Sequence, residues 1–167
     1  PQVGASSRSA SPAPLPNRSY GVVFSSGTEG NLVGGATTGE GNTIAYNGVQ
    51  SLGGSGSGTG VFVNSGAQKN RVRRNAIFGN QDGGISLNNG NNNISPPVIN
   101  EIFQLPPTVT GRASFIVRGT GGGAADGSTV EVFSDVASQG EIPLGEVTLS
   151  SGNWSVEKEA DTSKNIT

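Results

Sequence analysis

Residues 42–47 read NTIAYN and residues 75–80 read NAIFGN, so an N-x-I-x-x-N pattern occurs twice with identical spacing. Each copy follows a short apolar run that begins with glycine, GVVF at 21–24 and GVFV at 60–63, and a third such run, GISL, follows at 84–87. Self-similarity over a few dozen residues is typical of architectures in which one supersecondary unit stacks on the next. The repeat therefore predicts stacked units rather than a single globular core.

The two copies stay in phase beyond these strings. Asn31 and Asn70 lie at the same distance from the glycines that open their rows, and Val33 and Val72 follow them by the same step. The first row is longer because it contains two loop-like stretches, GGATTGE and VQSLGGSGSG. The shared unit has roughly two dozen residues and several short strands, which predicts the rungs of a parallel β-structure.

Stacking also explains a composition that does not suit a thick core. The chain of 167 residues is 32% hydrophobic with 28 glycines, yet its charged fraction is only 13% and its net charge is -2, which argues against a self-repelling disordered chain. We expect Val61, Val63, Val72 and Ile77 to point inward and to be buried by the next rung. Asparagine tolerates left-handed backbone at corners, and its amide can hydrogen-bond the equivalent asparagine one rung away.

The strings NLVGG at 31–35, GNTIAYNG at 41–48 and NAIFGN at 75–80 resemble the right-handed parallel β-helix repeat proteins of the pectate-lyase-like class. The resemblance covers residues 20–99. It implies an all-β fold with a short right-handed parallel β-helix of about three coils. That class includes lyases, hydrolases, adhesins and structural fibres, so the resemblance does not select a function.

A second module follows the sequence SPPV at 95–98, because two adjacent prolines cannot both donate to an interior ladder. The later runs GSTVEVFSD, LGEVTL and GNWSVE alternate apolar and polar residues, and they resemble immunoglobulin-like β-sandwich modules of bacterial surface proteins. We expect Trp154 at the centre of a small core and a last strand that is incomplete at 165–167. The expected domains are an extended Ser/Pro-rich arm at 1–19, the β-helix at 20–99 and the sandwich at 100–167.

Cysteine, methionine and histidine are all absent, which excludes disulfides, thiolate nucleophiles, Cys/His zinc sites and serine–histidine pairs. Glycoside hydrolysis needs two carboxylates that face one cleft, whereas the repeat region offers only Glu29, Glu40 and Asp82. We therefore expect no catalytic residues, cofactor or metal. No apolar segment is long enough to span a membrane, so no membrane insertion is expected.

The only concentrated charge is the candidate anion- or glycan-binding set Lys69, Arg71, Arg73 and Arg74. If Val72 points inward, Arg71 and Arg73 share the outer face, where guanidinium groups could grip carboxylate or sulfate groups of a cell-surface polysaccharide. A solvated face with local ion pairs is the favoured alternative. Nucleic acid is disfavoured because the chain is mildly acidic and has no aromatic stripe. Calcium binding is also disfavoured, since the candidate ligands lack dense D-x-D spacing; they are Asp126, Asp135 and Asp161.

The leading hypothesis is a non-catalytic structural building block of a secreted or cell-surface assembly, such as a fibre, sheath or adhesin stalk, from a prokaryote. Copies are expected to form a homo-polymer through open β-edges, by stacking of the helix or by strands lent from the N-terminal arm or the C-terminal tail. Two alternatives stay open: an accessory or C-terminal fragment of a secreted polysaccharide-active enzyme, and a glycan-binding adhesin.

Overall fold

The computed structural model describes residues 17–48, 58–106, 113–135, 139–160 and 165–166. Most of the predicted N-terminal arm therefore lies outside the described residues. The described chain is all-β, as predicted, and its helical content is one short 3-10 segment, η2 (Asn91–Asn93). Asn91, Asn92 and Asn93 all have positive φ, as do Asn89 and several corner glycines, which agrees with the expectation that asparagine and glycine mark the corners.

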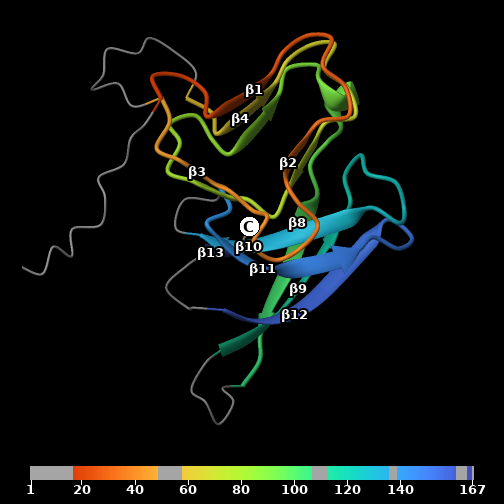
Figure 1. The fold of residues 1–167 in the computed structure, drawn as a ribbon. Helices are drawn as coiled ribbons and strands as arrows, with labels where there is room; N and C mark the ends of the chain where they lie inside the picture. Colours follow the sequence, from red (N-terminus) through yellow and green to blue (C-terminus); the bar gives the residue numbers. More distant parts are fainter. Residues whose placement is uncertain (1–16, 49–57, 107–112, 136–138, 161–164, 167) are drawn as a thin grey trace, which may run out of the picture.

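Seven short strands in the first half pair only in parallel (Figure 1). They fall into a first rung (residues 21–47), a second rung (60–80) and an incomplete third rung (84–93). The predicted phase is confirmed, because Val22 pairs with Val61, Val33 with Val72 and Ile44 with Ile77. The three parallel sheets are β1 (Val22–Phe24), β4 (Val61–Val63) and β7 (Ile85–Leu87); β2 (Leu32–Gly34) and β5 (Arg71–Arg73); and β3 (Thr43–Ala45) and β6 (Ala76–Phe78).

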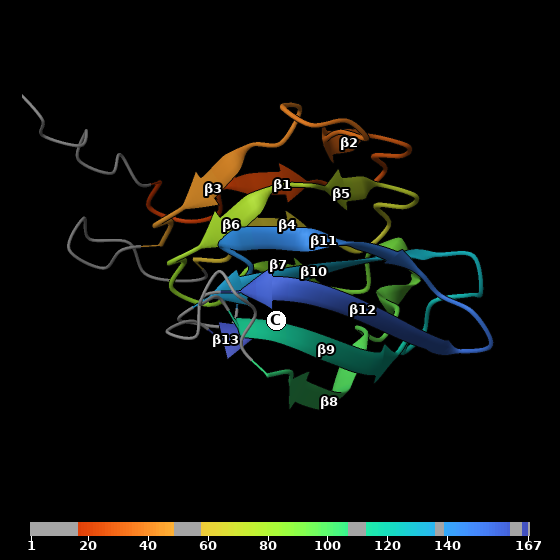
Figure 2. The same cartoon turned by 90° about the horizontal axis from the view of Figure 1, so that it is seen from below.

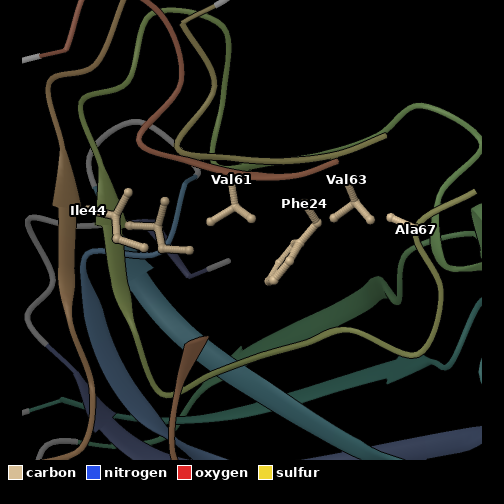
Figure 3. Packing of buried hydrophobic residues seen from close by; sticks show 6 residues of the cluster. Phe24, Ile44, Val61, Val63 and Ala67 are labelled. Carbon is tan, nitrogen blue, oxygen red and sulfur yellow. The ribbon is translucent and has the colours of Figure 1, made fainter. Parts of the chain in front are cut away.

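The apolar side chains of these rungs share one interior. Val61, Val63 and Ile77 are 0%, 1% and 4% exposed, and Val72 packs against the same cluster, so all four predicted inward residues are confirmed. Figure 3 shows side chains from different rungs converging on this interior, among them Phe24. The second rung is buried most completely because it has neighbours on both sides, which is how sparse aliphatic residues suffice for a core.

The glycine that opens the second row has a specific steric reason. A Cβ on Gly60 would lie 2.6 Å from Cγ2 of Ile77 and 2.8 Å from Nδ2 of Asn80. Gly21 meets the equivalent atoms of Ile44 and Asn47 in the first rung, at 2.6 and 2.7 Å. The opening glycine therefore leaves room for the amide of the N-x-I-x-x-N pattern, and this contact connects the two sequence signals.

The second half contains two antiparallel sheets with a separate core of Val117, Val130, Val132, Leu149 and Trp154. The indole Nε1 of Trp154 donates to the carbonyl oxygen of Thr120 at 3.0 Å, so the prediction of a structural tryptophan is confirmed. One sheet orders β12 (Asn153–Ala160), β9 (Ala113–Thr120) and β8 (Val98–Gln104); the other orders β11 (Ile142–Thr148), β10 (Thr129–Asp135) and the two-residue β13 (Asn165–Ile166).

Neither half forms a closed sheet in the described residues. The third rung contributes one strand, so β2–β5 and β3–β6 remain two-stranded. In the second half, β13 pairs with β10 only at Ser134 and Asp135. Figure 2 shows the first rung at one edge of the molecule and β8 at the opposite edge. The side of β6 that faces away from the first rung is thus left for another part of the chain.

Candidate interaction surfaces

Side-chain amides form ladders at three corners of the rungs. Nδ2 of Asn31, Asn42 and Asn47 in the first rung donates to Oδ1 of the equivalent second-rung asparagine, at 2.9, 3.0 and 2.8 Å. The same Oδ1 atoms also accept the backbone N–H of the first-rung asparagine, at 3.0 to 3.1 Å. The amide pairing predicted from the sequence is confirmed. The ladders are Asn31–Asn70–Asn91, Asn42–Asn75 and Asn17–Asn47–Asn80–Gln139.

These ladders have a direction. The Oδ1 of each second-rung asparagine accepts two N–H groups from the first rung, while its Nδ2 donates back to a carbonyl oxygen of that rung. Asn80, for example, accepts from Asn47 and donates to the carbonyl of Ile44 at 3.0 Å. Asn80 is 2% exposed, and a buried amide of this kind is costly unless it is fully paired. The ladders therefore fix both the register of the rungs and their order.

The lower side of β6 is covered by Gln139 and Gly140, which precede β11. The backbone N–H of Ile77 donates to the carbonyl of Gly140 at 2.8 Å, so these two residues occupy the position of a third strand. Gln139 replaces the next ladder asparagine: its Oε1 accepts the N–H of Asn80 at 2.9 Å, and its Nε2 donates to the carbonyl of Asn80 at 2.8 Å. One hydrogen-bonded column thus runs from the first rung into the second half.

A charged cluster joins the same two parts of the molecule. Arg74 donates from Nε and an Nη to both carboxylate oxygens of Glu146, at 2.8 and 2.9 Å, and Arg73 donates to Glu146 at 3.0 Å. Glu131 accepts the backbone N–H of Arg74 at 3.0 and 3.1 Å and lies 3.7 Å from Nε of Arg73. The bidentate Arg74–Glu146 pair is the strongest geometry for this type of contact.

The two carboxylates respond to this cluster in opposite ways. Hydrogen bonding from Arg74 lowers the pKa of Glu146, and the charges of both arginines add to this effect. Burial raises the pKa of Glu131 above its usual range, although the N–H of Arg74 and the charge of Arg73 partly oppose the rise. Acidification therefore weakens the folded state through Glu146, while protonation of Glu131 favours the folded state.

The predicted anion-binding set is divided by the fold. Arg73 and Arg74 are directed to Glu131 and Glu146 of the second half, and Lys69 pairs with Glu29 in an exposed contact of 2.5 Å. The side chain of Arg71 is exposed and forms no ion pair within the part of the chain that the structure describes. Glycan binding by this set stays a prediction, and Arg71 is the member that the fold leaves exposed.

The acidic residues considered for chemistry lie apart from one another. The carboxylate of Glu40 accepts the N–H of Thr37, which lowers its pKa, and Asp82 accepts the N–H of Gly58 at 2.6 Å. Asp126 accepts two turn N–H groups, and buried Asp135 accepts the N–H of Gln139 and Gly140. Asp161 lies outside the described residues, and among those described no group of three acidic side chains could hold a metal.

Within the residues that the structure describes, the upper end of the first rung is an open surface. The first-rung strands bond to the second rung through backbone groups of Val22, Phe24, Asn31 and Asn42. In a parallel ladder, alternate residues bond to opposite sides, so the residues between these four direct their backbone N–H and C=O groups to the open end. A hollow of about 680 Å³ lies over this end. It is lined by residues of all three first-rung strands together with the ladder, including Val22, Leu32, Val33, Asn42, Thr43 and Asn47.

Sequence reasoning found the asparagines of this surface but missed the residues that cover the opposite side. Gln139, Glu131 and Glu146 lie beyond the repeat, where no spacing relates them to the rungs. Comparison with protein-family models, with curated proteins and with solved structures gave no match. Within the described ranges, no helix is long and apolar enough to cross a membrane.

Proposed function

We propose that this chain is a non-catalytic structural building block of a secreted or cell-surface assembly. In this proposal, the rungs from residue 21 to residue 93 form a short right-handed parallel β-helix, and the second half, which begins with β8, is an immunoglobulin-like β-sandwich that closes one end of it. The observation that supports the proposal best is the difference between the two ends. The lower side of β6 is bonded to Gln139 and Gly140, whereas within the described residues the upper end presents unpaired strand edges and ladder amides.

The open end has the properties of a joining surface. Val23 and Leu32 are 45% and 47% exposed on the first rung, although their strands bond fully to the second rung. Edge strands with free N–H and C=O groups pair with other strands, and proteins usually protect such edges. A building block that is closed on one side and open on the other would end or begin a stack.

Identical copies would join more readily through the exposed edge strand β8 than through the open rung. β8 is exposed along nearly all of its length, and Ile102 and Phe103 are 47% and 46% exposed. An apolar edge strand of this length is a site for antiparallel pairing with a second chain. The expected homo-polymer would therefore use β8 or lent strands, while the open rung would connect the chain to the rest of the assembly.

The proposal is tested by recovering the chain from the cells that produce it. We expect the chain in high-molecular-weight surface material, and we expect Thr43→Pro to release it, because proline removes an edge N–H without touching the bonds to the second rung. Thr38→Pro is the matched control, since Thr38 lies in the turn between Thr37 and Glu40, where proline is tolerated. Recovery of the wild-type chain only as a free monomer would contradict the proposal.

A further inference from the structure

The contact between Asn17 and Asn47 shows how the open end can accept an asparagine. Asn17 precedes the first rung, and its backbone N–H and Nδ2 both donate to Oδ1 of Asn47, at 3.2 and 3.1 Å. This is the geometry that Asn47 itself adopts toward Asn80 one rung below. Asn17 also stands at the same distance from Gly21 as Asn80 does from Gly84. One of the three ladders is thus already extended past the first rung by a single asparagine.

The other two ladders stop at first-rung acceptors. Asn31 and Asn42 are exposed, and each directs its N–H and Nδ2 down to Asn70 or Asn75. By the direction of the ladder, their Oδ1 atoms face the open end, where the described chain supplies a donor only to Asn47. The open end therefore presents a defined pattern of amide acceptors beside bare strand edges.

We infer that this end is a one-way acceptor for a further parallel β-rung, one that offers asparagine N–H and Nδ2 donors in the orientation of Asn17 and is not a second copy of this chain. The inference rests on the proposed function. Continuity with the existing interface sets the register: the incoming strands lie parallel on β1, β2 and β3, and the incoming asparagines lie over Asn31 and Asn42.

A second copy of this chain does not meet these requirements. Two upper ends placed face to face would oppose Oδ1 to Oδ1 at Asn31 and Asn42, which leaves buried acceptors unpaired at a cost of about 1–3 kcal/mol each. The lower side cannot supply the donors either. The N–H groups of Asn70 and Asn80 already donate to Asn91 and Gln139, and Nδ2 of Asn75 donates to the carbonyl oxygens of Val33 and Arg73.

The test uses the full chain with one inserted rung. A copy of residues 60–83 replaces residues 17–20, so that the copied asparagine 80 takes the place of Asn17 before Gly21. We expect amide hydrogen exchange at Leu32 and Thr43 to slow by about tenfold or more, the change that one net hydrogen bond gives. In a control insertion, Asn70→Ala and Asn75→Ala within the copy should abolish most of this protection.

Two results would overturn the inference. The first is the same exchange rate at Leu32 and Thr43 in the copied rung and in its alanine control, whether that rate is slow or fast. The ladder amides would then not determine whether the added rung binds. The second is a dimer of the unmodified chain in sedimentation velocity that Thr43→Pro dissociates. Neither measurement depends on recovering an assembly from cells, so failure of the proposed function remains distinguishable from failure of this inference.

Discussion

Replacing Asn80 by alanine should be among the most damaging single changes in the rungs. Asn80 is 2% exposed, accepts the N–H and Nδ2 of Asn47 at 3.1 and 2.8 Å, and donates to the carbonyl of Ile44 at 3.0 Å. A net contribution of about 1 kcal/mol for each bond gives a loss of about 3 kcal/mol, and the stranded N–H groups of Asn47 raise it toward 4 kcal/mol. A domain with a total stability of about 5–15 kcal/mol would be visibly weakened.

The matched control is Asn88→Ala. Nδ2 of Asn88 makes an exposed contact of 3.4 Å with Asn64 on the outer surface, so its loss should cost less than about 0.5 kcal/mol. Urea unfolding followed by far-ultraviolet circular dichroism gives both free energies of unfolding. If Asn80→Ala costs no more than Asn88→Ala, the ladders do not hold the rungs together, and the reasoning from buried amides is refuted.

Substitutions at the junction between the two halves and at the corners of the rungs should also change stability. Gln139→Ala should lower the free energy of unfolding by about 2 kcal/mol, because it removes two hydrogen bonds to the second rung. The unfolding transitions followed by circular dichroism and by tryptophan fluorescence should then separate, whereas replacement of the exposed Gln81 by alanine should change neither the stability nor the transitions. Coincident transitions in both variants would argue against coupling of the two halves through Gln139. The wild-type protein should lose stability below about pH 4.5, because the lowered pKa of Glu146 favours its carboxylate in the folded protein, and Glu146→Gln should make this loss smaller. An unchanged slope of stability against pH would contradict this. Gly34→Ala should lower the free energy of unfolding by more than about 3 kcal/mol, since the new Cβ would lie 1.8 Å from the carbonyl oxygen of Arg73. Gly27 has a similar positive φ but lies in open space, so Gly27→Ala should cost only about 1 kcal/mol. Equal melting temperatures for the two variants would exclude the clash.

The sequence was informative where one rung repeats the next. The paired N-x-I-x-x-N strings placed Ile44 over Ile77 and the amides of Asn42 and Asn47 over their equivalents, and the structure confirms this register. Such predictions succeed because stacking makes identical residues into neighbours, so that spacing along the chain becomes position in space. Trp154 was also predictable, because a lone tryptophan in an alternating strand has few places other than a core.

The sequence was uninformative where contacts join unlike elements. Arg73 and Arg74 read as a basic outer face, but the structure directs them to Glu131 and Glu146, which lie far along the chain in strands of alternating pattern. Gln139 likewise carries no repeat signal, although it continues a ladder. Such pairings arise from the packing of two different modules, and no local periodicity encodes them.

The ladder and strand bonds continue from the second rung into Gln139 and Gly140 of the second half. Hydrogen exchange at the amide of Ile77 tests this continuity directly, because this N–H donates to Gly140 at 2.8 Å, while the amide of Val61 donates to Gly84 of the third rung at the same distance. We expect both amides to exchange equally slowly, at rates close to those of global unfolding. Fast exchange of Ile77 beside a protected Val61 would contradict this expectation.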